Sequence, residues 1–174
     1  MQKLGSISGP SPLTFAAMTS PQPKVLGLFI SADHNFFGHH DLPPGTSPVE
    51  ERSSVLCLAG RGIEGDRFLD FKPDYKGQIT FFASEVFTEL TQTLGLKNVH
   101  PSALRRNVLT EGVDLAHWFN AEFEIQGVRF AGAGECSPCY WMDRALGPGA
   151  EKFLKGRGGL RARILSTGTL RLNP

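Results

Sequence analysis

Two cysteines three positions apart are the residues of this chain best suited to chemistry. Cys136 and Cys139 enclose a Ser-Pro dipeptide, and Tyr140 and Trp141 follow them directly. A thiolate can act as a nucleophile, a redox group or a ligand for a soft metal. The pair follows a predicted hairpin and lies near glycine-rich and basic segments, which favours thiolate chemistry over a structural bridge.

Two conventional sites that use such a pair fit the chain poorly. A structural zinc site needs two further ligands, and Cys57 with the histidines at 34, 39 and 40 gives no recognisable ligand spacing. A thioredoxin-like pair should begin a helix after a strand, and no amphipathic helix is predicted after Trp141. The histidine loop itself could form a metal site, an anion site or a plain aromatic loop, and the last is favoured for His39 and His40.

A third interpretation treats the cysteines as small core residues, because a free cysteine is among the most buried residue types. This structural role is preferred for Cys57 and Cys136. Cys139 is interpreted instead as a reactive or metal-binding thiol, on grounds that come from the rest of the chain.

A glycine-rich segment at 62–67 ends in Asp66 and Arg67. It lacks both the spacing of a dinucleotide fingerprint and the lysine of a phosphate-binding P-loop. The planar guanidinium of Arg67 suits phosphate or carboxylate. The alternative is an ordinary turn that carries Asp66 and Arg67 on the surface.

Two further basic clusters lie later in the chain. Arg105 and Arg106 precede Asn107 at the start of a predicted strand, where consecutive side chains point to opposite faces, so only one arginine should reach a shared site. Arg161 and Arg163 alternate with small apolar residues and therefore share one face of a strand. That face could be a ligand site or could lie in solvent.

The elements that must position these residues are mostly short strands. They are expected at 25–31, 55–59, 78–83, 107–110, 122–126, 128–131, 160–166 and 167–172. Ser84 is expected to cap a helix whose apolar stripe ends near Gly95, and 150–155 should form a shorter helix. Many short strands, together with 20 glycines and 12 prolines, predict a mainly β protein, a β-barrel with a few flanking helices.

Composition narrows the class of protein. The 174 residues have the size of one domain, expected at 24–174, with a disordered tail or leader at 1–23. A net charge of +1 gives no bulk field for nucleic acid or anionic lipid, and no apolar run approaches the roughly 20 residues of a membrane span. Three cysteines, an odd number, favour a reducing cytoplasm.

In their order along the chain, these segments resemble the MOSC domain family, named after the C-terminal domain of molybdenum cofactor sulfurase. The resemblance covers about residues 24–172. The matching pieces are 62–67, 106–108, 111–115, the hairpin through 126–127, Pro138-Cys139, and 159–165 with Gly168.

The resemblance implies a MOSC-type β-barrel that binds molybdenum cofactor, the molybdenum-bearing molybdopterin. In this family one cysteine ligates molybdenum or carries sulfur as a persulfide, and Cys139 matches it. Arg67, Arg106 and Asn107 match the polar positions that would hold the pterin phosphate and dithiolene. Asp66 and Arg163 complete the expected cofactor-binding set.

The implied function is sulfur transfer to the cofactor, or molybdenum-dependent reduction of N-hydroxylated compounds, which would make the protein a sulfurtransferase or an oxidoreductase. The sequence has no pyridoxal-phosphate desulfurase segment and no ferredoxin-type cysteine set. Sulfur or electrons would therefore come from a partner protein. Two alternatives stay open: a non-catalytic cofactor carrier, and a small thiol-disulfide protein that works through Cys136 and Cys139.

Overall fold

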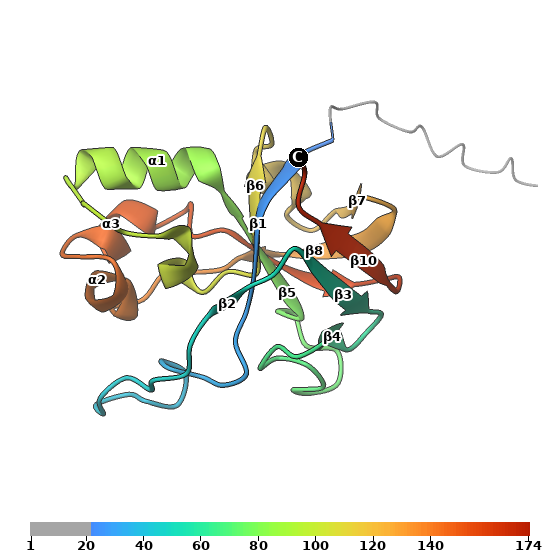
Figure 1. The fold of residues 1–174 in the computed structure, drawn as a ribbon, viewed down its shortest axis with the longest axis horizontal. Helices are drawn as coiled ribbons and strands as arrows, with labels where there is room; N and C mark the ends of the chain where they lie inside the picture. Colours follow the sequence, from blue (N-terminus) through green and yellow to red (C-terminus); the bar gives the residue numbers. More distant parts are fainter. Residues whose placement is uncertain (1–21) are drawn as a thin grey trace, which may run out of the picture.

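The computed structural model describes residues 22–174, in which two β-sheets are flanked by short helices at one end (Figure 1). Apart from its last two residues, the predicted tail at 1–23 lies outside the described residues. The strands are β1 (Lys24–Ile30), β2 (Glu50–Glu51), β3 (Ser54–Leu58), β4 (Gly62–Ile63), β5 (Ile79–Ala83), β6 (Val108–Glu111), β7 (Glu122–Ile125), β8 (Val128–Glu135), β9 (Leu160–Ile164) and β10 (Gly168–Arg171). The helices are α1 (Ser84–Thr93), α2 (Trp141–Ala145) and α3 (Ala150–Leu154), with 3-10 turns at Pro101–Leu104 and Leu115–Trp118.

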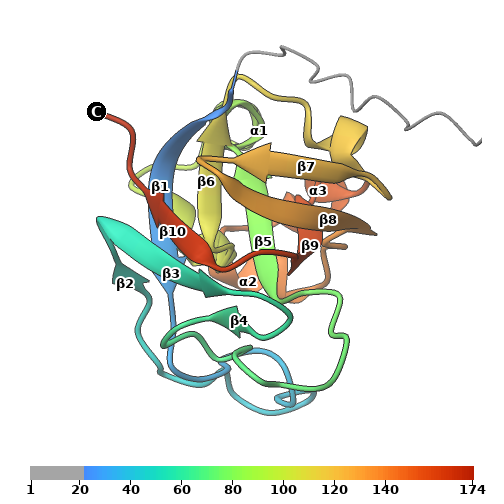
Figure 2. The same cartoon turned by 90° about the vertical axis from the view of Figure 1, so that its right-hand side faces the viewer.

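The prediction of a mainly β fold with a few helices is confirmed. One sheet has the order β2-β1-β6-β5-β9-β8-β7 and the other β10-β3-β4, and the second lies across the first (Figure 2). The larger sheet ends in β2 on one side and β7 on the other, so its hydrogen bonds form an open sheet and not a ring. Apolar side chains of both sheets share one buried core, to which Ile63, Phe81, Phe130 and Leu170 contribute.

A second apolar cluster packs the helices against the outer side of β5. It contains Phe82, Leu90, Leu104, Met142, Leu146, Ala150 and Leu154. The helix predicted after Ser84 is confirmed as α1, and Gly95 follows it with φ +60°, as expected after a helix end. The predicted cap is wrong: Ser84 is the first helical residue, and Ala83 holds the cap position without a side-chain hydrogen bond.

The predicted hairpin positions the segment that carries Cys136 and Cys139. β7 and β8 pair through Phe123 and Phe130, and the turn residues Gln126 and Gly127 both have positive φ, at 52° and 80°. Two positive φ values are typical of the tight turn that matches strand twist. Because β8 continues to Glu135, Cys136 follows directly from its end.

Two short strands and one short helix were absent from the prediction. β2 and β4 are only two residues long each, and α2 only five. The expectation that no helix follows the cysteine pair is therefore wrong, since α2 begins at Trp141. Within residues 22–174, no helix has the length and apolar character needed to cross a membrane.

Candidate functional site

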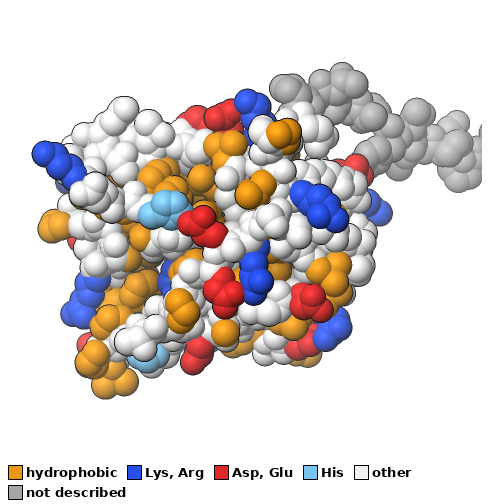
Figure 3. Space-filling model, in the orientation of Figure 1, with side chains coloured by type: hydrophobic (Ala, Val, Ile, Leu, Met, Phe, Trp, Pro, Cys, Tyr) orange, Lys and Arg blue, Asp and Glu red, His pale blue; other side chains and the backbone are white. Residues whose placement is uncertain are grey.

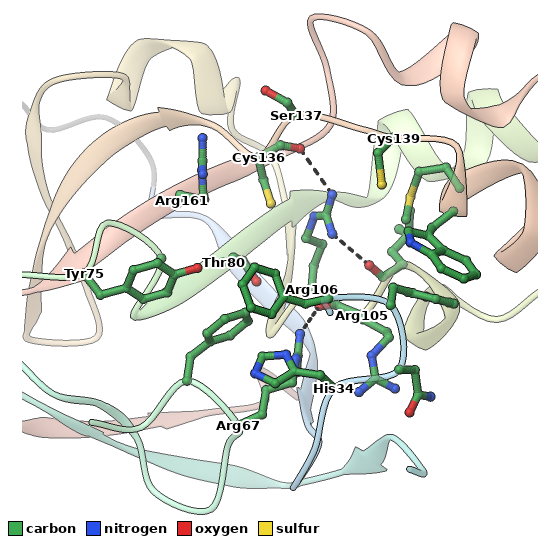
Figure 4. Close-up of a pocket in the computed structure, with 18 residues that line it drawn as sticks. His34, Arg67, Tyr75, Thr80, Arg105, Arg106, Cys136, Ser137, Cys139 and Arg161 are labelled. Atoms are coloured by element: carbon green, nitrogen blue, oxygen red, sulfur yellow. Dashed lines mark hydrogen bonds between the residues drawn. The ribbon is translucent and has the colours of Figure 1, made fainter. Parts of the chain in front are cut away.

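One cavity of about 200 Å³ brings both cysteines of the Cys-x-x-Cys segment together with four arginines (Figure 4). Its wall includes Cys136 and Cys139 from the segment after β8, and Arg161 from β9. Arg67, Arg105 and Arg106 come from the loops that follow β4 and precede β6, and all line the cavity. Of the residues predicted for the site, Cys139, Arg67 and Arg106 therefore meet here.

Arg67 is the cavity arginine that is paired with a carboxylate. Its Nη1 lies 3.1 Å from Asp66 Oδ2, and its Nη2 donates to the Arg105 carbonyl at 3.1 Å. Burial lowers the pKa of Arg67, and the Arg106 charge adds to this, while Asp66 opposes it. The Asp66 side chain is only 1% exposed. The alternative that Asp66 and Arg67 lie on a surface turn is therefore wrong.

Arg106 is bound entirely through backbone carbonyls. It donates from Nε to Gly158 at 3.1 Å, from Nη1 to Leu104 at 2.9 Å and from Nη2 to Cys136 at 3.2 Å. These bonds tie three segments of the chain together beneath the cysteine pair (Figure 4). Carbonyls carry no full charge, and Arg106 forms no ion pair with a carboxylate in the described part of the chain.

Arg105 fastens the long loop after β1 to the same wall. Its Nη2 donates to Ser31 Oγ at 2.7 Å and to the Asp33 carbonyl at 2.6 Å, and its Nη1 donates to the Ser47 carbonyl at 3.2 Å. Burial, together with the Arg67 charge, lowers the pKa of Arg105 to about 10, so it stays protonated at neutral pH.

Both Arg105 and Arg106 reach the cavity, so the prediction that only one of them would do so is wrong. Arg105 has φ 53°, and β6 begins only at Val108. The strand alternation on which the prediction rested does not apply to these residues.

Asn107 and Asp66 lie behind the cavity wall and do not line it. Asn107 Oδ1 accepts from Thr80 N at 3.0 Å and from Thr80 Oγ1 at 2.8 Å, and its Nδ2 donates to Asp66 Oδ2 at 3.2 Å. Asp66 also accepts from the Ser31 and Phe68 amides. Both residues are buried, so they hold Arg67 and the strands in place.

Arg161 and Arg163 lie on the same face of β9, but only Arg161 reaches the cavity. Arg161 lines the cavity and donates from Nε to the Glu135 carbonyl at 3.1 Å. Arg163 lies outside the cavity lining and pairs with Asp74 at 2.6 Å. The predicted role of Arg163 in cofactor binding therefore gains no support from its position.

The net result is a concentrated positive charge. Among the described residues, only Arg67 of the four cavity arginines pairs with a carboxylate. Acidic and basic side chains are interspersed over the face seen in Figure 3, in keeping with the overall charge of +1. The cavity is therefore suited to an anionic ligand.

Aromatic side chains form the part of the wall that the sequence did not predict. They are His34, Phe36, Phe37, Phe68, Tyr75 and Trp141. Phe36, from the loop after β1, stacks on Trp141 with ring centroids 4.9 Å apart. Burial lowers the pKa of His34 and the Arg67 charge adds to this, which favours the neutral imidazole. His39 and His40 lie outside the lining.

The three cysteines have three different environments. Cys57 is fully buried in the core, as predicted, whereas Cys139 is exposed. Cys136 is half-buried and lines the cavity, so its predicted role as a core residue is wrong. Within residues 22–174, no group of three or more His, Cys, Asp or Glu could hold a metal ion.

Thiol titration should separate these environments. Burial raises the pKa of the Cys57 thiol to about 12, so this thiol stays protonated and shielded near neutral pH. We expect Ellman's reagent to modify Cys139 first and Cys136 next in the native protein at about pH 8, and Cys57 only after unfolding. Fast modification of a Cys136→Ser, Cys139→Ser double variant would contradict this expectation.

Comparison with known proteins identifies a matching domain family and several similar structures. Residues 65–173 match the MOSC domain. The structure is similar to the YuaD protein from Bacillus subtilis, with a TM-score of 0.66, 19% identity, and 87% of this chain and 92% of that chain covered. It is also similar to YiiM from Geobacillus stearothermophilus, with a TM-score of 0.62, 13% identity and 86% and 71% coverage.

A third similar structure is YiiM from Escherichia coli, with a TM-score of 0.55, 14% identity, and 70% of this chain and 60% of that chain covered. At these identities, the similarity to solved structures concerns the fold. A search of curated proteins gave no match.

Proposed function

Because the chain belongs to the MOSC domain family, we propose that it binds molybdenum cofactor in the arginine-lined cavity and uses Cys139 as its working thiol. The observation that carries this proposal is the convergence of a solvent-accessible thiol with four guanidinium groups, of which one is paired with a carboxylate. Guanidinium groups suit a pterin phosphate, and a thiolate suits molybdenum or its sulfur ligands.

The side chains present fit the chemical groups of the cofactor. Arg67 and Arg161 face the cavity with part of their donor capacity unused by the described residues, so they are the proposed phosphate ligands. Cys139 is the proposed metal or sulfur ligand. When bound, the cofactor supplies a molybdenum centre that exchanges electrons and takes sulfur ligands.

The aromatic wall would have to adjust to a ligand of this size. A cavity of about 200 Å³ is smaller than the roughly 300–1,000 Å³ of typical small-molecule sites. The Phe36 ring that stacks on Trp141 comes from a loop without strand or helix, which is the part of the wall best able to move.

Two uses of the bound cofactor are proposed: sulfur transfer to it, and reduction of N-hydroxylated compounds with it. In either use, a partner protein would supply the sulfur or the electrons. The proposed location is the reducing cytoplasm, where the three cysteines would stay unbridged. A carrier without turnover is the second candidate, favoured by the arginines alone. A thiol-disulfide protein is the third, favoured by two cysteines on one cavity wall.

The first test is anaerobic reconstitution with molybdenum cofactor, comparing the wild-type protein with Cys139→Ala and, as a control, Cys57→Ala. The expected result is a molybdenum–sulfur contact from the protein that X-ray absorption detects in the wild type and in Cys57→Ala but not in Cys139→Ala. The arginines should keep the amount of bound molybdenum in Cys139→Ala within about tenfold of wild type, because one lost ligand removes a small part of the binding free energy.

The outcomes separate the candidates. Equal binding without any protein-derived sulfur contact would favour the carrier, or a sulfur-transfer role without ligation. Absence of binding to all three proteins would overturn the proposed function and leave the thiol-disulfide protein as the leading candidate.

A further inference from the structure

Cys136 has no role in the proposed function, yet its surroundings resemble those of a working thiol more than those of a core residue. It is half-buried, lines the cavity, and lies three residues from the exposed Cys139. Both side chains point into the cavity in Figure 4, with the Arg106 guanidinium between them in this view.

The backbone around Cys136 is fixed on both sides. Its amide donates to the Gly159 carbonyl at 2.8 Å, and its carbonyl accepts from Arg106 at 3.2 Å. Gly159 itself must be glycine, because it has φ +99° and an added Cβ would lie 2.3 Å from the Phe81 carbonyl oxygen. The backbone that carries the Cys136 thiol is therefore held in one place, while Ser137 and Cys139 after it are exposed.

We propose that the two cysteines form a sulfur relay, in which Cys139 receives sulfane sulfur at the mouth of the cavity and Cys136 takes it over inside. The inference extends the proposed sulfur-handling role of Cys139 and rests on it. A persulfide adds one sulfur atom about 2 Å beyond the Cys139 Sγ, which lengthens the reach of the exposed side chain.

The transfer step needs no oxidant or reductant. The Cys136 thiolate attacks the outer sulfur of the Cys139 persulfide, a new sulfur–sulfur bond forms on Cys136, and the old bond breaks with its electron pair remaining on Cys139. The product is a Cys136 persulfide and a Cys139 thiolate, with the same number of atoms and electrons as before. The cations Arg67 and Arg106 favour an anionic persulfide at the inner position.

The test loads the reduced protein, without cofactor, with inorganic polysulfide under anaerobic conditions. Alkylation and tandem mass spectrometry then locate the added sulfur on Cys136 or Cys139, and cyanide measures how accessible it is. Wild type, Cys136→Ser, Cys139→Ser and the core control Cys57→Ala are compared.

In wild type and Cys57→Ala we expect the added sulfur on Cys136. Cyanide should remove it about tenfold more slowly than it removes sulfur from the exposed Cys139 of Cys136→Ser, because access controls the rate. Cys139→Ser should load about tenfold more slowly than wild type. Circular dichroism checks that Cys136→Ser and Cys139→Ser are folded before they are loaded.

Three results would overturn the relay. Added sulfur could stay on Cys139 in wild type, and cyanide could remove it as fast as it does from Cys136→Ser. Cys139→Ser could load as fast as wild type, which would make Cys136 a direct acceptor. Wild type could release hydrosulfide and form a Cys136–Cys139 disulfide, which would mean attack on the inner sulfur.

The relay and the proposed function fail in different ways. Cofactor binding is measured separately by reconstituting Cys136→Ser, which keeps Cys139 and all four arginines. Loss of the relay with binding intact removes only this inference, whereas a wild type that relays sulfur but binds no cofactor removes the proposed function. If no variant takes up sulfur, the sulfur-carrying role of Cys139 and the relay fall together.

Discussion

Replacing Asp66 with alanine is expected to lower the free energy of unfolding by about 3–5 kcal/mol, the usual effect of removing one partner of a buried ion pair. The Asp66 carboxylate accepts from the Ser31 and Phe68 amides, from Asn107 Nδ2 and from Arg67 Nη1. Without it, three buried or half-buried donors lose a partner and the guanidinium is left without its counter-charge. Urea denaturation followed by circular dichroism measures the change.

Asp70→Asn is the matched control, because Asp70 also pairs with an arginine, and asparagine fits the left-handed backbone of this position, which has φ 53°. Both Asp70 and Arg61 are more than half exposed, and exposed ion pairs contribute little to stability. Its unfolding midpoint should stay at that of wild type. Equal loss of stability in Asp66→Ala and Asp70→Asn would mean that the buried hydrogen-bond network does not support the fold as inferred.

The second large effect is expected on affinity. Arg161→Met should weaken the proposed binding of molybdenum cofactor about 10- to 150-fold, which corresponds to about 1.5–3 kcal/mol for a hydrogen bond to a charged group. Arg161 uses only Nε within the described protein, for the Glu135 carbonyl, and its remaining donors are available to a ligand. Methionine keeps much of the apolar stem, so β9 should keep its packing.

Arg163→Met provides the control two residues away on the same strand. Arg163 lies outside the cavity and pairs with Asp74, so its loss should leave affinity unchanged. Anaerobic fluorescence titration of the two variants with molybdenum cofactor makes the comparison. An equal fall in affinity would point to the overall charge and not to a specific site, and unchanged affinity in both would exclude Arg161 as a ligand.

The sequence predicted most elements whose signal is local. The apolar stripe of α1 and the paired turn residues Gln126 and Gly127 each lie within a few positions, and both elements are confirmed. The resemblance to the MOSC family is confirmed as well. The missed elements are β2, β4 and α2, which are too short to show a period of their own.

The site was harder to predict because its contacts are not local. Asp66 and Asn107 are 41 positions apart, yet they share a hydrogen bond in the interior. Both were expected in the cofactor-binding set, whereas only the fold shows that they are buried behind the wall. The stacking of Phe36 on Trp141 likewise joins two loops that no sequence period connects.

The carbonyl bonds of Arg106 also bear on the thermodynamics of ligand capture. An unrestrained arginine loses about 2 kcal/mol of rotamer entropy when a ligand immobilises it. Arg106 is already immobilised by the carbonyls of Leu104, Cys136 and Gly158, so that loss occurs once, during folding. The positive field inside the cavity is thus preorganised, and an arriving anion gains its attraction without having to order this side chain.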